Sequence, residues 1–181
     1  MTPSEYIQLK AFARVDGALL AVLWVASFAC YIMGVANSFY GIVAMVLMLI
    51  TPFFVGRRLG KFRDEGRGGI ISFGRGWAYS VFVFFYAAIL LALAQYAYFA
   101  FLDHGYLLQS FSKMMASPEA SQVLRQYDMQ QTMKESLDMM GQMRPIDYAL
   151  NVLTMNIMIG ILAGAPIAML MQRNTPKNVK L

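Results

Sequence analysis

The chain has 181 residues, of which 59% are hydrophobic and only 14% are charged, with a net charge of +5. A water-soluble domain carries about 25% charged residues, so this composition excludes an ordinary soluble domain and a disordered chain and predicts an integral membrane protein. One cysteine and one histidine provide neither a disulfide nor a set of zinc ligands.

Two long apolar runs without a charged residue come first. A helix needs about 20 apolar residues to cross a bilayer, and the segments 17–36 and 39–56 have this character. The connection between them is so short that the two helices are expected to form an antiparallel hairpin. The polar segment 57–69 follows, and its glycines favour a loop.

A third apolar run begins at Ile70 and is too long for one crossing. Because Arg75 lies within it, we place the third span at 76–101 and leave the preceding residues at the membrane interface. Ser72 is a candidate cap for the start of this helix.

The segment 103–145 has a different composition, with charged residues scattered along it. Ser117, Pro118 and Glu119 together are typical of a helix start: a hydroxyl cap, a proline in the first position and an acid at the positive end of the helix dipole. Apolar residues, many of them methionines, then recur at helical intervals as far as Gly141. This pattern predicts one amphipathic helix outside the hydrocarbon, which rests on the membrane or docks another protein.

A fourth span is expected over 146–172, followed by a basic tail. Pro52 and Pro166 each stand shortly before the end of a span, where they are expected to kink the helices and open a wedge between them. The fold class that follows is an all-α integral membrane protein. It forms a single domain with four transmembrane helices and one extracytoplasmic amphipathic helix.

Lysine and arginine are unevenly distributed around the predicted spans. Eleven of them lie before the first span, between the second and third, and after the fourth, whereas the segment 103–145 has only four, together with five acidic residues. Basic flanks stay in the cytoplasm. We therefore expect a multi-pass protein of a bacterial inner membrane with both termini in the cytoplasm.

The stretch Phe62-Arg63-Asp64, followed by Gly-Gly-Ile-Ile-Ser-Phe-Gly at 68–74, introduces the third span. Together with the chain length, the four spans and the large third connection, it resembles the domain-of-unknown-function family 4199, whose members are small integral membrane proteins of Bacteroidetes. The resemblance covers essentially the whole chain, with 63–74 as its one local motif. It implies a membrane location and assigns no activity.

The basic connection between the second and third spans has two interpretations. The favoured one is a topology signal that needs no ligand. The other is a cradle for the phosphate of an anionic lipid, an isoprenoid carrier or a partner's substrate, because the arginine side chain pairs with phosphate through two donors. The candidate residues are Arg57, Arg58, Lys61, Arg63, Arg67 and Arg75. The positive charge favours anionic lipid over nucleic acid, for which no motif is present.

Polar residues within the spans form a second candidate site. Asp147, Asn151 and Thr154 lie on one face of the fourth span, and Gln95 lies at a comparable depth in the third. We favour hydrogen bonds that lock the two helices together; the alternative is a polar cavity with Asp147 as its ligand-binding group. The opposite side of the fourth span carries small residues expected to serve helix packing: Asn156, Gly160 and Gly164.

No set of residues suited to acid–base or nucleophilic chemistry converges, so we expect no enzyme, no catalytic residue, no cofactor and no metal. The leading hypothesis is a non-catalytic accessory or scaffold subunit for a membrane-associated partner in envelope or lipid-linked precursor metabolism. The alternative is a small transporter or lipid-handling protein with a polar site between the third and fourth spans. Expected partners are the bilayer, anionic lipids and either a membrane protein or further copies of the chain.

Overall fold

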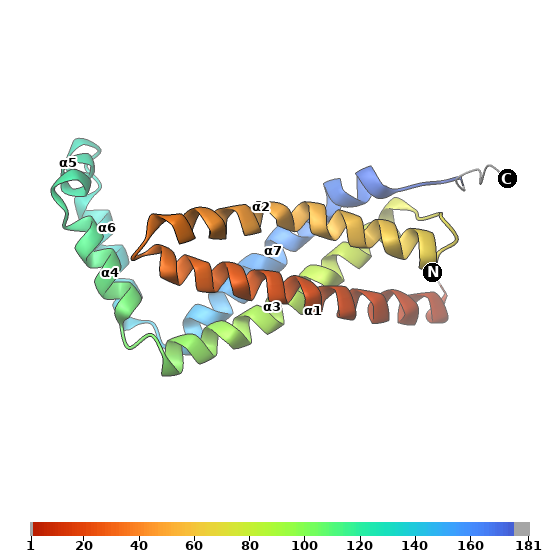
Figure 1. The fold of residues 1–181 in the computed structure, drawn as a ribbon, viewed down its shortest axis with the longest axis horizontal. Coiled ribbons are helices and arrows are strands. Elements are labelled where there is room, and N and C mark those ends of the chain that lie inside the picture. The colour runs from red at the N-terminus through yellow and green to blue at the C-terminus, as the bar shows by residue number, and fades with distance from the viewer. Residues whose placement is uncertain (1, 176–181) are drawn as a thin grey trace. The chain divides into compact units, whose positions relative to one another are not determined.

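The computed structural model describes residues 2–175, and regular structure within that range is helical throughout. Four helices are long and apolar enough to cross a membrane: α1 (Pro3–Gly34), α2 (Ser38–Lys61) with its π-helical extension η1 (Phe62–Gly66), α3 (Phe73–Phe101) and α7 (Pro145–Met171) (Figure 1). Three shorter helices separate α3 from α7: α4 (Tyr106–Met115), α5 (Pro118–Gln126) and α6 (Gln130–Gln142). The predicted all-α fold with four apolar spans is confirmed.

The chain divides into two compact units, and α3 and α7 contribute residues to both. Unit 1 comprises Met1–Ala92 and Asn151–Leu181, and unit 2 comprises Leu93–Leu150. Unit 1 therefore contains α1, α2, η1 and most of α3 and α7. Unit 2 contains the helical insert α4–α6 and the helix ends that flank it.

Helix α1 begins much earlier than residue 17, where its apolar run starts. Thr2 caps it: the Thr2 hydroxyl accepts a hydrogen bond from Glu5 N at 3.3 Å, and Thr2 N donates to Glu5 Oε2 at 2.8 Å. This capping box and Pro3 in the first helical position favour a start at that point. At 1.5 Å per residue, the 32 residues are longer than about 30 Å of hydrocarbon, so part of α1 projects beyond it.

The prediction of a loop over 57–69 was wrong for residues 57–66, which are helical. Helix α2 continues to Lys61 and then widens into the π-helical turn η1. Phe62 drives this extension because its ring is buried and stacks on that of Tyr79 at a centroid distance of 4.9 Å. The chain turns only at Gly68 and Gly69, whose φ angles of 62° and 85° suit glycine.

The predicted hairpin of α1 and α2 forms, and the two helices lie side by side in unit 1 (Figure 1). Polar side chains join them inside the apolar surface. Trp24 Nε1 donates to Thr51 Oγ1 at 3.0 Å, and Ser27 Oγ donates to a backbone carbonyl oxygen of α2 at 2.9 Å. Such buried hydrogen bonds hold membrane helices together where lipid provides no hydrophobic driving force.

Helices α3 and α7 approach each other closely in unit 1 through the small residues of α7. A Cβ atom on Gly160 would overlap the side chain of Phe84, and one on Gly164 would lie 3.2 Å from Ser80 Cβ. Asn156 is buried, and its Nδ2 donates to the Val152 carbonyl oxygen of its own helix at 2.9 Å. Gly160 and Gly164 of the ridge predicted for helix packing thus lie against α3.

The insert in unit 2 was predicted as one amphipathic helix, and this was wrong: it forms three. Ser117 caps α5, accepting from Ala120 N at 3.3 Å, which is where a helix start was predicted. The helix stops after Gln126 because Asp128 adopts a left-handed conformation with φ 53°, and α6 then begins at Gln130. Asp103, which is buried, accepts from the backbone N–H groups of Gly105 and Leu107 and fixes the start of α4.

Candidate functional site

The start of α1, the end of η1 and the start of α3 lie at the same end of unit 1 (Figure 1), and ionisable side chains pair with one another in and near this region. We call this region the charged end. Its members are Glu5 and Asp16 of α1, Arg58 of α2, Arg63 and Asp64 of η1, Arg67, Arg75 of α3 and Arg173. A charged side chain is costly close to hydrocarbon unless it is paired, so the pairs formed here define the site.

Asp16 is the centre of the most buried group. It is 2% exposed and receives hydrogen bonds from two helices: Arg58 of α2 binds its Oδ1, and the Tyr79 hydroxyl of α3 donates to its Oδ2. Three helices are thereby tied at one carboxylate. Sequence reasoning missed Asp16, although an isolated acid directly before an apolar run, with an arginine and a tyrosine at the inner ends of the next two spans, was the available signal.

Glu5 joins the start of α1 to the connection between η1 and α3. Its Oε1 pairs with Arg67 Nη2 at 2.8 Å, and its Oε2 pairs with Arg75 Nη2 at 2.9 Å. Gln8, one turn further along α1, donates from Nε2 to the Gly66 carbonyl oxygen at 3.2 Å. One carboxylate therefore pairs with two of the candidate phosphate ligands, Arg67 and Arg75.

Arg63 connects η1 to the end of α7. It is buried, pairs with Asp64 through two parallel hydrogen bonds of 2.7 and 2.9 Å, and donates from Nη1 to the Met171 carbonyl oxygen at 2.9 Å. Arg173 Nη1 lies 3.6 Å from the same aspartate, and its backbone forms an antiparallel bridge with Ile71 through two bonds of 3.0 Å. The Arg-Asp motif of the sequence therefore holds helix ends together.

The six basic residues of the predicted cradle do not converge on one anion site. Arg58, Arg63, Arg67 and Arg75 each pair with a carboxylate of the charged end. Lys61 lies 3.8 Å from Glu65, with both side chains exposed, and Arg57 is exposed without an ion pair to any residue in 2–175. A role in binding phosphate stays a prediction, and Arg57 is the arginine among the six that pairs with no carboxylate of residues 2–175.

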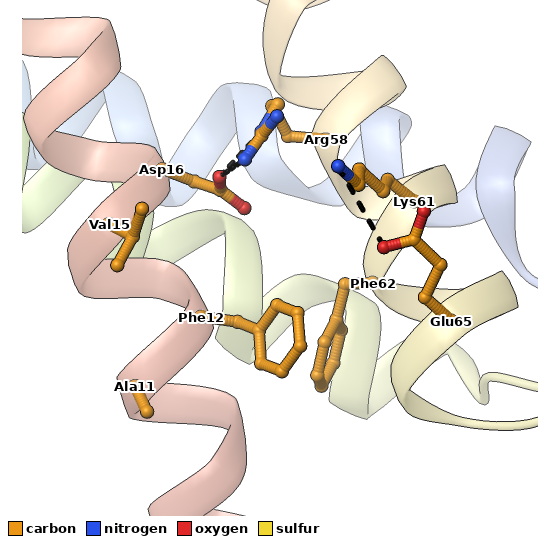
Figure 2. A pocket seen from close by; sticks show the side chains of 8 residues that line it. All are labelled: Ala11, Phe12, Val15, Asp16, Arg58, Lys61, Phe62 and Glu65. Atoms are coloured by element: carbon orange, nitrogen blue, oxygen red, sulfur yellow. Dashed lines mark hydrogen bonds and ion pairs between the residues drawn. The ribbon is translucent and has the colours of Figure 1, made fainter.

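A pocket of 330 Å³ opens between α1 and the end of α2, and Figure 2 shows the side chains that line it. Phe12 and Phe62 face each other with ring centroids 5.1 Å apart, and the Asp16–Arg58 and Lys61–Glu65 pairs lie beside them. The charges cancel within each pair, so the pocket presents aromatic surface beside neutralised ions. Within the described range 2–175, no three His, Cys, Asp or Glu side chains come together to hold a metal.

Residues 16–173 match the family described as "Protein of unknown function (DUF4199)". The chain belongs to this family. The match confirms the resemblance to this family. It includes every member of the charged end except Glu5. No curated protein and no solved structure matches the chain.

The intramembrane polar residues of this DUF4199 protein are divided between its units. In unit 2, Asp147 pairs with Arg144 at 3.0 Å and accepts from Arg144 N at 2.9 Å, so it caps the start of α7. Gln95 is buried, and its Oε1 accepts no hydrogen bond from the described residues. In unit 1, Asn151 and Thr154 are exposed. A shared role for these four residues stays a prediction.

Proposed function

We propose that this multi-pass membrane protein is a non-catalytic accessory subunit that docks a membrane-associated protein through the helical insert α4–α6. One observation carries the proposal: neither α5 nor α6 buries a single residue. Short isolated helices are marginal in water, and most helical stability in proteins comes from packing an apolar face against something else. These two helices therefore have a surface that a partner would cover.

The exposed side chains of the insert have the chemistry of an interface. Val123 is 53% exposed, Tyr127 67% and Met139 62%, and further exposed methionines stand at 114 and 129. Burial of apolar surface contributes about 25 cal/mol per Å², and tyrosine is enriched in protein interfaces. Methionine adapts its shape to a partner surface.

Charge favours a protein partner over the lipid surface. Helices that lie on a membrane surface are rich in lysine and arginine on their polar face. The segment 103–145 instead has four basic and five acidic residues. Attraction to anionic headgroups would therefore be weak, whereas a protein surface can match either sign of charge.

The charged end supports a scaffolding role. Its carboxylates and arginines pair with one another and tie together the ends of α1, α2, α3 and α7. Such pairs fix the relative positions of helices rather than leaving ionised groups for chemistry. We place the protein in a bacterial inner membrane, with the charged end in the cytoplasm, the insert outside it, and a partner in envelope or lipid-linked precursor metabolism.

Site-specific photo-crosslinking in cells tests this proposal. A photoreactive amino acid is placed at Tyr127 or at Met139, and the adducts are identified by mass spectrometry. We expect one discrete protein adduct from both positions. It should disappear when Val123→Glu is added and persist with the matched control Gln126→Glu, a change at an exposed polar residue of the same helix.

Adducts with lipid alone would overturn the proposal in favour of a membrane-surface helix, and adducts with a second copy of the chain would replace the partner with a homo-oligomer. Unchanged circular dichroism of each variant in mild detergent shows that a lost adduct reflects a lost contact.

The alternative, a small transporter or lipid-handling protein, is favoured by one observation in unit 2. The buried Gln95 Oε1 accepts no hydrogen bond from residues 2–175, and a buried acceptor left unsatisfied costs about 1–3 kcal/mol. A polar ligand would satisfy it. A proteoliposome efflux assay with Gln95→Leu and Asp147→Asn tests this: both changes should abolish efflux in a transporter, whereas an accessory subunit shows no efflux to abolish.

A further inference from the structure

A groove of 510 Å³ lies between α2 and α7 in unit 1, at the level of the two helix prolines. Pro52, Gly56 and Arg57 line it from α2, and Ala163, Pro166 and Leu170 line it from α7. It lies where the sequence predicted a wedge between the proline-bearing helix ends. The volume falls in the range of about 300–1,000 Å³ that is usual for pockets that hold small ligands.

The walls of the groove are apolar and outward-facing. Phe53 is 77% exposed and Leu170 is 84% exposed, and both belong to helices that are apolar enough to cross a membrane. At the floor of the groove the two helices lie near each other, since a Cβ atom on Gly56 would stand 3.9 Å from Ile167 Cγ2, an ordinary van der Waals distance. In a bilayer such a groove faces hydrocarbon, and its natural occupant is an acyl chain.

One end of the groove carries a positive charge. Arg57 follows Pro52 by five residues, which places it about 7.5 Å further along the axis of α2 towards the charged end. It is exposed and forms no ion pair with any residue between 2 and 175, whereas its neighbour Arg58 is held by Asp16. A guanidinium group binds phosphate through two parallel hydrogen bonds. The groove therefore matches a phospholipid along its length: its apolar walls suit an acyl chain, and Arg57 at one end suits the headgroup phosphate.

We propose that the α2–α7 groove binds one anionic phospholipid, with an acyl chain along Pro52, Ala163 and Pro166 and the headgroup phosphate on Arg57. This site does not depend on the docking role of the insert. A free phosphate would use only Arg57 and leave the apolar walls uncovered, and a neutral lipid would use only the walls. Lysine and arginine around the inner span ends place Arg57 in the leaflet that carries anionic lipid.

Native mass spectrometry of the full-length protein tests the proposal. The protein is reconstituted in nanodiscs that contain equal amounts of phosphatidylglycerol and phosphatidylcholine with identical acyl chains. The lipids that stay bound to the protein after its release from the nanodisc are then counted. We expect one phosphatidylglycerol to be retained in preference to phosphatidylcholine by about fivefold, which corresponds to about 1 kcal/mol for one basic residue near the membrane surface. Arg57→Gln should remove the preference, and Arg57→Lys should keep most of it.

Two further variants separate the groove from general charge. Arg14→Gln removes an exposed cation of α1 that has no carboxylate partner among the described residues, and it should leave the preference unchanged. Gly56→Leu fills the groove and should reduce retention of both lipids. If this variant fails to fold, the variants at the exposed Arg57 still test the proposed site. If Arg14→Gln reduces the preference for phosphatidylglycerol as much as Arg57→Gln does, or if Arg57→Gln leaves that preference unchanged, the proposed site is wrong. Displacement of the lipid by millimolar inorganic phosphate would make Arg57 a phosphate site without a lipid groove.

Discussion

Tyr79 and Asp16 lie 63 residues apart in the sequence and meet in the interior of unit 1, where the tyrosine hydroxyl donates to the carboxylate. Arg58 holds the other carboxylate oxygen. The two donors come from different helices, so this one acid joins α1 to both α2 and α3. Asp16 is almost fully buried, so its ionised carboxylate is stable there only while both partners are present.

Removal of Asp16 should therefore destabilise the protein strongly. We expect Asp16→Leu to lower the free energy of unfolding by about 3–5 kcal/mol, because it leaves Arg58 without its carboxylate in a partly buried site. Tyr79→Phe removes one hydrogen bond and should cost about 1–3 kcal/mol. Thermal unfolding in mild detergent, followed by circular dichroism, measures both.

The double variant Asp16→Leu with Arg58→Met serves as the control. A buried ion pair replaced by apolar residues is often neutral, so the double variant should be more stable than Asp16→Leu alone. If the two changes are simply additive, the pair does not act as a unit and the assignment of Asp16 as a junction is wrong.

Gly160 should tolerate no side chain. Gly160→Ala improves helix propensity by about 1 kcal/mol, but its Cβ would overlap Phe84 of α3 and overpacking costs about 1–3 kcal/mol, so we expect net destabilisation. Gly41→Ala is the matched control, since its Cβ would meet only Gly34 Cα at an ordinary 3.9 Å. The same unfolding measurement should show Gly41→Ala neutral or stabilised; equal effects would contradict close packing of α3 on α7.

The four spans could be predicted because hydropathy is a local property of each segment. The cap at Ser117 was equally local, since the hydroxyl, the proline and the acid are consecutive. The position of Asp16 depends on a partner in each of two other helices, and no pattern within one segment reveals such a contact. This is why the arginines looked like a free cradle in the sequence, whereas in the structure Arg58, Arg63, Arg67 and Arg75 are paired.

Helix ends were harder to predict than helix existence. The glycines of 66–69 predict a loop, but Gly66 lies inside η1, and of these three glycines only Gly68 and Gly69 adopt positive φ. Burial of Phe62 against Tyr79 overrides the weak local preference there. The break at Asp128 was missed because most residues around it are compatible with a continuous amphipathic helix, and aspartate only occasionally adopts the left-handed conformation.

Glu5→Gln should loosen the connection after η1. The carboxylate pairs with both Arg67 and Arg75, so the amide leaves both guanidinium groups without their anion. Trypsin cleavage of the detergent-solubilised protein after Arg67 should then accelerate, because cleavage requires local opening. Glu65→Gln removes only the exposed pair with Lys61 and should leave the rate unchanged; acceleration by both variants would indicate a general charge effect.

Asp128→Gly should stabilise the turn between α5 and α6. Asp128 has φ 53°, a conformation that glycine adopts without steric cost, whereas a β-branched residue is strained there. We expect slower hydrogen exchange in α5 and α6 for Asp128→Gly and faster exchange for Asp128→Val. The reverse order would mean that the insert forms one continuous helix, as the hydrophobic periodicity alone suggests.

The orientation of the chain can be tested with two exposed positions on opposite sides of the predicted membrane. Eleven lysines and arginines flank the spans on the side of the termini, against four in the insert, so Gln126 should face outward and Asn174 inward. In a chain in which Cys30 is replaced by alanine, a membrane-impermeant maleimide added to spheroplasts should label Gln126→Cys directly. It should label Asn174→Cys only after permeabilisation. Labelling of Asn174→Cys in intact spheroplasts, alone or together with Gln126→Cys, would contradict the predicted orientation, and with it the placement of Arg57 in the inner leaflet.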